Sequence, residues 1–309
     1  MKRVRPLVLF LIIAIAFTVA DVANADLKCD LCGKTITGSY THYPDIGINV
    51  CSQCEQNKPR CDNCRRPVNE PLRVGSARLC QRCAASVERC HSCGTALLRD
   101  YTYFEGNEAL RFCSECVARY PICADCGAPS GPRGTKLNDG RYLCPDCRSV
   151  ALFEPGLITP IKNQVLSYLD SGMGMRIKHD IKYSLQDKIF LKIESKDMHG
   201  DLNGLFYRKG DDYNIYVLYG LRKKDLIGVL AHEITHAWQA ENCSGNLELE
   251  DLEGFAQWVA YYALIYYDYE RFAQTMLSGN SVYATGLRKM LEIEKRGGSK
   301  AVFDYIRSR

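Results

Sequence analysis

Three residues within the segment Leu230–Gln239 have types and a spacing that suit metal chemistry. This segment, LAHEITHAWQ, contains His232 and His236, with Glu233 directly after the first histidine. On a helix, side chains four residues apart project from the same face, so both imidazoles could bind one ion. Neutral imidazole suits Zn²⁺, and a catalytic zinc keeps one position for water, which Glu233 would face as general base. The same short pattern also occurs by chance, and a buried helix can carry two hydrogen-bonded histidines without a metal.

A third ligand is expected from the next helix, because a catalytic zinc usually has three protein ligands. The segment Leu247–Tyr267 predicts a long helix, with Glu250 and Glu253 on one face. Large apolar residues surround Glu253, and burying a carboxylate among them is costly unless it is paired or metal-bound. Gly254 would let this helix pack closely on the first. We therefore predict Glu253 as the third ligand, with Glu250 as its rival.

Tyr283 is a candidate second catalytic residue. It lies in the stretch SVYATGLRK, where the pattern indicates a loop turning into a helix. A phenol at such a position could donate a hydrogen bond to a developing oxyanion. The alternative is an ordinary packed tyrosine, one of 19 in the chain.

Sixteen of the 17 cysteines form eight C-x-x-C pairs between residues 29 and 147. Spacers of 18, 15, 19 and 17 residues alternate with spacers of six residues, which indicates four tandem repeats of two pairs each. Two such pairs make one tetrahedral Cys₄ zinc site, so we predict four structural zinc ions and one catalytic ion. The predicted structural ligands are Cys29, Cys32, Cys51, Cys54, Cys61, Cys64, Cys80, Cys83, Cys90, Cys93, Cys113, Cys116, Cys123, Cys126, Cys144 and Cys147. The remaining cysteine, Cys243, is assigned no role.

Two other chemistries compete for these cysteines. In an oxidising compartment they could form disulfides, although disulfide frameworks rarely consist of C-x-x-C pairs alone. A thiol-disulfide redox protein is a further alternative, but it needs such a pair at the start of a helix after a buried strand. A repeat of about thirty residues buries too little surface to fold alone, so zinc would supply most of its folding free energy.

The N-terminus, residues 1–25, resembles a secretory signal peptide. A basic start precedes an apolar run of 14 residues, Leu7–Ala20, and small residues before Asp26 fit a cleavage site. The run is shorter than the roughly 20 residues of a membrane span. We expect an exported chain, periplasmic or secreted, with no stable membrane span after cleavage. An uncleaved signal that tethers the chain to the membrane is the alternative.

The charge balance argues against nucleic-acid binding. The formal net charge is +4, and residues 26–150 carry 17 basic and 14 acidic side chains. Four zinc ions held by sixteen thiolates would turn the small positive charge of this region negative, whereas a nucleic-acid binder has a basic footprint. The expected partners are a protein or peptide substrate and a protein that binds the zinc fingers.

Residues 151–309 predict a mixed domain in which Ala151–Pro160 is a linker or the start of a helix. The predicted helices are Ile161–Leu169, Val229–Glu241 and Leu247–Tyr267, and the predicted strands are Ile181–Tyr183, Ile189–Ile193, Gly204–Tyr207 and Tyr213–Tyr219. A strand followed directly by the histidine helix is the order expected where an edge strand lies above a zinc helix. Such an edge can pair with an extended peptide.

The segment Ile215–Gln239 resembles the peptidase domain of the plant organ-size-regulating, ubiquitin-activated LIM peptidases. Glu253-Gly254 and the later Tyr283-x-x-Gly286-Leu287-Arg288 follow in the same order as in that family, and the resemblance covers roughly residues 150–309. It implies an α+β fold with a small gluzincin-like zinc peptidase domain. The ligands that it implies are His232, His236 and Glu253, with Glu233 as general base.

The cysteine repeats are similar to LIM fingers but depart from them in two ways. LIM domains join their two fingers by two residues and commonly use a histidine ligand, whereas here the spacer is six and all ligands are cysteine. No ubiquitin-interacting motif is visible, so the family's activation and substrates are not carried over.

Together these patterns predict a signal peptide (1–25), four LIM-like Cys₄ units (26–150) and a zinc metallopeptidase domain (151–309). The enzyme would hydrolyse peptide bonds through a zinc-bound water, with the fingers recognising substrate or a partner. The alternative is a zinc-finger adaptor with a vestigial peptidase domain.

Overall fold

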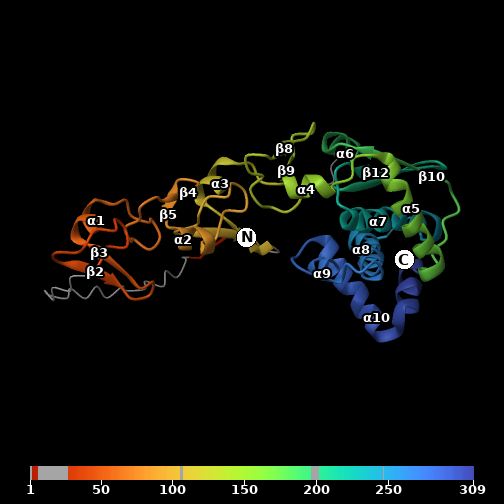
Figure 1. Cartoon of the computed structure of the whole chain (residues 1–309). Helices are drawn as coiled ribbons and strands as arrows, with labels where there is room; N and C mark the ends of the chain where they lie inside the picture. Colours follow the sequence, from red (N-terminus) through yellow and green to blue (C-terminus); the bar gives the residue numbers. More distant parts are fainter. Residues whose placement is uncertain (1, 6–26, 105–106, 196–201, 246) are drawn as a thin grey trace. The chain divides into compact units, whose positions relative to one another are not determined.

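The computed structural model describes residues 2–5, 27–104, 107–195, 202–245 and 247–309. The chain divides into two compact units, Met1–Thr135 with Tyr142–Pro145, and Lys136–Arg141 with Asp146–Arg309 (Figure 1). Among the described residues, none of the helices is long and apolar enough to cross a membrane.

The cysteine repeats share one structural plan, which confirms the prediction of four tandem Cys₄ units. Each repeat starts with a knuckle closed by an isolated β-bridge, continues into a hairpin, and ends in a six-residue helix that begins directly after the third cysteine. The hairpins are β2 (Tyr40–Tyr43) with β3 (Ile48–Cys51), β4 (Leu72–Val74) with β5 (Ala77–Leu79), β6 (Tyr101–Phe104) with β7 (Asn107–Phe112), and β8 (Thr135–Lys136) with β9 (Tyr142–Leu143). The helices are α1 (Ser52–Asn57), α2 (Gln81–Ser86), α3 (Ser114–Arg119) and α4 (Pro145–Val150).

Each finger has a very small hydrophobic core. The residue directly before the third cysteine is buried in every repeat, and these residues are Val50, Leu79, Phe112 and Leu143. Only a few other side chains join Val50, Leu79 and Phe112, and several of those are the cysteines themselves. Such cores are too small to stabilise a repeat without a bound metal.

Part of the predicted targeting segment is described. Lys2–Arg5 form β1, which pairs antiparallel with β6 of the third finger. Residues 1 and 6–25 lie outside the described residues, so the signal peptide stays a prediction.

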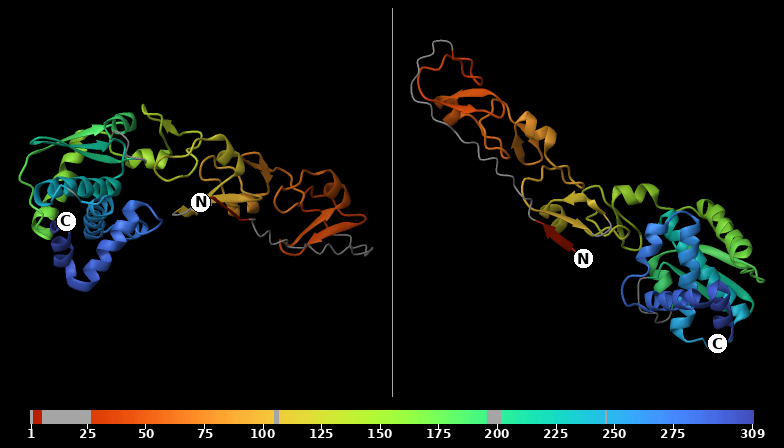
Figure 2. Two further views of the ribbon diagram at one scale, coloured as in Figure 1. Left: turned by 180° about the vertical axis from the view of Figure 1, so that it is seen from behind. Right: turned by 90° about the horizontal axis from the view of Figure 1, so that it is seen from below.

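The second unit is a mixed α+β domain, as predicted. Its sheet has the order β10-β12-β11, with β10 parallel and β11 antiparallel to the central strand β12. The strands are β10 (Ile181–Gln186), β11 (Gly204–Lys209) and β12 (Asp212–Leu218). The helices are α5 (Pro155–Ser167), α6 (Lys188–Glu194), α7 (Lys223–Asn242), α8 (Leu249–Tyr266), α9 (Glu270–Thr275) and α10 (Val282–Arg307), with a π-helical turn η1 (Tyr168–Gly172) after α5. Helix α7 packs on the sheet, α8 packs on α7, and α10 packs on α8 (Figure 2).

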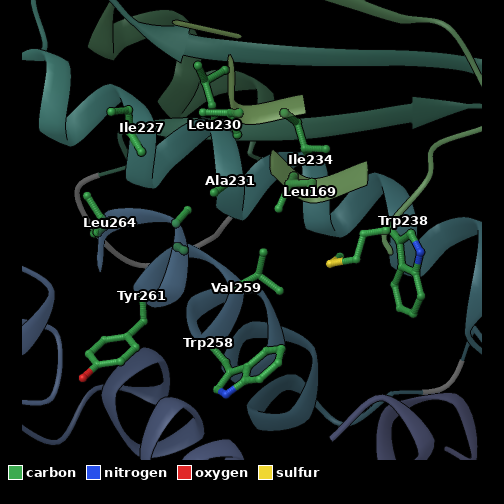
Figure 3. Close-up of a cluster of buried hydrophobic side chains, with 14 of the residues drawn as sticks. Leu169, Ile227, Leu230, Ala231, Ile234, Trp238, Trp258, Val259, Tyr261 and Leu264 are labelled. Atoms are coloured by element: carbon green, nitrogen blue, oxygen red, sulfur yellow. The ribbon is translucent and has the colours of Figure 1, made fainter. Parts of the chain in front are cut away.

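The hydrophobic core of this unit surrounds α7 (Figure 3). Leu230 and Ile234 of α7 are fully buried, and Trp258 and Val259 of α8 belong to the same cluster. Phe255 of α8 adds an aromatic ring that is also fully buried. Helix α7 is therefore a core helix, covered by the sheet on one side and by α8 on the other.

The predicted strand Ile189–Ile193 is wrong, because these residues lie in α6. Asp187 caps this helix, since its carboxylate accepts a hydrogen bond from the N–H of Phe190 at 2.7 Å. Leu191 is buried, whereas Ile189 and Ile193 are exposed, so the burial follows a helical period rather than the alternation of a strand. The short apolar run did not distinguish the two periods.

Three other predictions from the sequence need adjustment. Helix α5 begins at Pro155, earlier than predicted, and carries Pro160 inside it. Strand β12, which directly precedes α7, is the central strand of the sheet, so the edge strand beside the histidine helix is β11. Gly254 does not serve contact with α7 but contact with α10.

The loop between β8 and β9, Lys136–Arg141, belongs to the second unit. The Asp139 carboxylate is fully buried and accepts hydrogen bonds from the N–H of Lys188, at 3.1 Å, and from Arg141. Arg141 also donates to the backbone oxygen of Tyr219 at 2.8 Å. Burial raises the pKa of Asp139, but these donors outweigh it and hold the pKa below its usual value. The loop therefore holds the end of β12 and the start of α6.

Two glycines allow α8 and α10 to touch backbone to backbone. A Cβ on Gly286 would lie 2.5 Å from the Cα of Gly254 and the backbone oxygen of Glu250. A Cβ on Gly254 would lie 2.6 Å from backbone atoms of Gly286. Glu253 directly precedes Gly254, and Tyr283 lies one helical turn before Gly286. This contact therefore sets the positions of two predicted site residues.

We predict that Gly286→Ala destabilises the second unit by about 1–3 kcal/mol, the usual cost of overpacking, because α8 and α10 must separate. Gly228→Ala is the matched control, since its Cβ would meet Leu264 at an ordinary 3.5 Å. That exchange should be neutral or stabilise α7 by up to about 1 kcal/mol. Thermal unfolding followed by the helical circular dichroism signal measures both. Equal stability of Gly286→Ala and the parent would contradict the close contact.

Candidate metal centre

The two histidines of α7 are held so that their Nε2 atoms face each other. His232 Nδ1 lies 3.0 Å from Gln257 Oε1, and His236 Nδ1 lies 2.8 Å from Gln239 Oε1. The Gln239 amide is itself oriented, because its Nε2 donates to the backbone oxygen of Leu252. An amide oxygen only accepts, so each Nδ1 carries the proton and each Nε2 keeps a lone pair.

The carboxylate of Glu253 completes a group of three converging ligand atoms. Its Oε2 lies 3.0 Å from His232 Nε2 and 3.5 Å from His236 Nε2, and the two Nε2 atoms are 3.0 Å apart. Ligands at 2.0–2.1 Å from a tetrahedral zinc ion would be about 3.3 Å from one another. Lone pairs this close repel unless a cation lies between them, so the donor set fits zinc. The rival Glu250 is exposed at the start of α8.

The surroundings keep Glu253 charged. Burial alone would raise the pKa of this carboxyl group, since only 3% of the residue is exposed. The neighbouring imidazoles of His232 and His236 outweigh burial and lower the pKa of Glu253 well below its usual range. Glu253 thus provides an anionic oxygen, although its role as ligand stays a prediction.

Glu233 lies beside this group without belonging to it. Its Oε2 accepts a hydrogen bond from the N–H of Phe206 in β11 at 2.8 Å. Burial raises the pKa of Glu233 above its ordinary value, and this effect exceeds the opposing influence of His232 and His236. Gly204 contacts the same side chain, because a Cβ there would lie 2.9 Å from Glu233 Oε1 and 2.5 Å from Val229. Strand β11 therefore passes directly over the predicted general base.

Tyr283 reaches the site from the first turn of α10. Ser281 caps this helix by accepting from the N–H of Ala284. The Tyr283 ring lies 5.8 Å, centroid to centroid, from the ring of His232. Burial, followed by the charges of Glu253 and Glu233, raises the pKa of Tyr283 to about 12. The hydroxyl is therefore protonated at neutral pH and can donate a hydrogen bond.

These residues line a cavity of about 440 Å³. Strand β11, the exposed face of α7, the loop that follows it and the start of α8 form its walls, together with Tyr283. The volume lies within the range of protein ligand sites. The predicted metal ligands, the predicted general base and Tyr283 thus all line the same cavity.

The cysteines form four groups of four in the fingers, and within each group all sulfur atoms lie within 4.8 Å of one another. In each group the second and third sulfur atoms are 3.8–4.0 Å apart. A disulfide would require about 2.05 Å, whereas thiolates at 2.3 Å from a tetrahedral zinc ion are about 3.8 Å apart. The groups are Cys29, Cys32, Cys51 and Cys54; Cys61, Cys64, Cys80 and Cys83; Cys90, Cys93, Cys113 and Cys116; and Cys123, Cys126, Cys144 and Cys147. None of the cysteines in the described residues forms a disulfide, so the arrangement is consistent with structural zinc.

Backbone amides also favour the thiolate form that zinc requires. Burial raises the pKa of Cys29, but N–H groups of Cys51, Cys32 and Leu31 outweigh it and lower the pKa to about 6. The N–H of the third cysteine points at the first sulfur in the third and fourth groups as well. Such amides stabilise a charged sulfur before a metal binds.

Four site residues escaped the sequence analysis. Gln239 lies three residues after His236, a spacing that allows contact on a helix, so the sequence contained a signal for it. Gln257, Gly204 and Phe206 come from other elements and carry no comparable local signal.

The chain is similar to two plant proteins. One is the LIM domain-containing protein HDR3 of rice (Oryza sativa subsp. japonica), 25% identical over 252 aligned residues, which cover 65% of this chain and 50% of the rice protein. The other is Protein DA1-related 7 of Arabidopsis thaliana, 25% identical over 177 residues, which cover 44% of this chain and 31% of that protein. The chain thus spans half or less of the length of these relatives. No protein-family profile and no solved structure matches it.

The match to the rice protein covers 65% of this chain. This share is larger than residues 26–150 alone, and larger than residues 151–309 alone. The match therefore includes parts of both the finger region and the second unit. This supports the resemblance to LIM-type proteins that the sequence indicated, at the level of LIM-like metal-binding modules.

We predict five zinc ions per chain, one for each of the five ligand groups. Glu253→Ala should reduce the content to four, because it removes the anionic ligand, while Glu250→Ala should keep five. Elemental analysis of the purified variants, with thiol titration, measures this. One zinc ion or fewer, with thiols resistant to alkylation until reduced, would mean disulfides in the fingers. Loss of zinc in Glu250→Ala alone would mean that the wrong carboxylate was assigned.

Proposed function

We propose that this chain is a zinc-dependent metallopeptidase of the gluzincin type. The observation that carries the proposal is the position of Glu233. This carboxylate is 8% exposed, adjoins three converging ligand atoms without joining them, and faces the same cavity. A purely structural zinc site has no need of such an additional carboxylate. The similarity to a DA1-related protein agrees with this proposal.

The residues of the site have distinct roles in the proposed reaction. A zinc ion held by His232, His236 and Glu253 would polarise the scissile carbonyl and acidify a bound water. Glu233 would accept a proton from the attacking water and deliver it to the leaving amine. Tyr283, protonated at neutral pH, would donate a hydrogen bond to the developing oxyanion.

Strand β11 is suited to hold the peptide. It is an edge strand, since β12 pairs with it on one side and the cavity lies on the other. The N–H of Phe206 points away from β12 towards Glu233. An extended peptide could add to this edge and bring its backbone past the site.

The fingers are proposed to recognise a protein, either the substrate or a separate partner. Four repeated metal-binding modules provide an extended surface, and one relative is named for its LIM domains. The alternative, an adaptor with a vestigial peptidase domain, would use the same surface without cleavage.

Export is part of the proposal. Residues 1–25 would direct the chain out of the cytoplasm, and cleavage would expose Asp26. N-terminal sequencing of the protein recovered from the exported fraction should read from Asp26. A chain that keeps its N-terminus would indicate a membrane tether or no export.

We predict that Glu233→Gln keeps five zinc ions and the fold but cleaves unstructured peptides at least about 10²–10⁴-fold more slowly. Glutamine preserves the volume but cannot accept the proton. Zinc content and cleavage rates are measured on the same preparation. Equal cleavage by variant and parent would identify another base or a contaminant. If neither form cleaves and a partner binds both, the adaptor function replaces the peptidase.

The pH dependence provides a further test. Glu233 must be deprotonated to accept a proton, and burial raises its pKa above the ordinary 4.5. We therefore predict that kcat/KM falls, at constant zinc content, as the pH is lowered and Glu233 becomes protonated. Tyr283→Phe should lower kcat without changing this pH dependence, because the pKa of Tyr283 is about 12. A kcat/KM that does not fall on acidification while zinc stays bound would contradict Glu233 as the base.

A further inference from the structure

The cavity continues beyond the metal centre along α7. Ala240 and Cys243 line it. Ala240 lies four residues after His236 on the same helix face, and Cys243 directly follows the last residue of α7. At a rise of 1.5 Å per residue, they are about 6 and 10 Å further along the axis. We call this extension the α7 pocket. The proposed reaction makes no use of it.

Two walls enclose the α7 pocket. Strand β11 runs beside α7 in the same direction, because Gly204 contacts Glu233 whereas Arg208 Nη1 donates to the backbone oxygen of Ala240 at 3.3 Å. On the other side, Leu252 lines the cavity and is held to α7 by the hydrogen bond that Gln239 donates to its backbone oxygen. The pocket therefore has fixed sides that begin at the metal centre.

The lining of the α7 pocket is mainly apolar. Phe206, Leu247 and Leu252 face it together with Ala240 and Cys243. Phe206, Leu247 and Cys243 are only partly buried and pack against the hydrophobic core. When a ligand covers apolar surface that is accessible to water in a cavity, the burial of that surface contributes favourably to the free energy of binding.

The charges near the α7 pocket disfavour an acidic ligand group. Arg208 lies exposed at the rim, and its Nε and Nη1 already donate to the backbone oxygens of Gly210 and Ala240. The pocket ends at the C-terminus of α7, the negative end of the helix dipole. At its other end, the charges of Glu233 and Glu253 would be offset by the two positive charges of a bound zinc ion. An apolar group is thus the occupant that fits the lining.

We propose that the α7 pocket binds a bulky apolar side chain, of the size of Leu, Met or Phe, from the residue next to the scissile bond. Ala240 and Cys243 set its depth, because a larger side chain at either position would fill it. This inference rests on the proposed peptidase function and names its substrate class.

The test uses a set of unstructured peptides that differ only at the residues flanking one bond. The full-length zinc-loaded parent should cleave peptides with Leu, Met or Phe there at least about tenfold faster, in kcat/KM, than those with Gly or Asp. Ala240→Phe should reduce that preference at least about tenfold while it still cleaves the Gly peptide. Sequencing of the products shows on which side of the bond the preferred residue lies.

Two further variants sharpen the test. Cys243→Phe should cause the same change as Ala240→Phe, so the pocket can still be judged if one of them loses zinc or fails to fold. Ala85→Phe is the matched control, because Ala85 is exposed on α2 of the second finger. It should keep the preference of the parent.

The outcomes separate this inference from the proposed function. If the parent cleaves none of the peptides, the peptidase function itself fails. If it cleaves them without preference, or prefers Asp, the peptidase stands and the apolar pocket is overturned. If the parent prefers bulky apolar residues but both pocket variants keep that preference, the side chain binds elsewhere.

Discussion

Each polar side chain on the buried part of α7 needs a hydrogen-bond or charge partner close by, because burying an unpaired charge or imidazole in a hydrophobic core costs free energy. The amide oxygens of Gln257 and Gln239 accept from Nδ1 of His232 and His236, and a cation between the two Nε2 atoms and Glu253 would satisfy the remaining lone pairs. The backbone of β11 supplies the donor for the acidic residue between the two histidines. The positions of α8 and β11 are therefore constrained by the polar groups of one helix. Helix α8 is in turn held by its backbone contact with α10.

This dependence explains how far the sequence could predict the site. The four-residue spacing of His232 and His236 determines that they share a helix face, so their convergence follows from local geometry. Glu250 and Glu253 share a face as well, and only the tertiary packing of α8 distinguishes the buried carboxylate from the exposed one. Gly204 had no local signal, because its requirement arises from contact with a helix that comes later in the chain.

The fold was predictable to a similar degree. The cysteine spacing predicted four repeats, because metal geometry imposes a fixed pattern on the chain. The apolar run that became α6 was misread, since a short segment of alternating apolar residues fits either period. The capping aspartate before it was the available signal, and it indicates a helix start. The partner of Gly254 was also missed. A glycine in a helix indicates that another helix packs closely on it, but the sequence does not identify which helix that is.

The fingers and the second unit reach stability by different routes. The second unit has an extensive core of its own, whereas each finger has only a few buried side chains around its cysteines. The fingers therefore need a bound metal in order to fold, whereas the second unit would need its metal at α7 mainly for the proposed reaction.

The loop Lys136–Arg141 has a consequence for how such a chain can be rearranged during evolution. Its buried Asp139 holds the start of α6, and Arg141 holds the end of β12, the strand that leads into the histidine helix. A recombination event at residue 150 would remove both. The first three fingers can be gained, lost or exchanged as a cassette, but the last hairpin has to be inherited together with the domain that follows it.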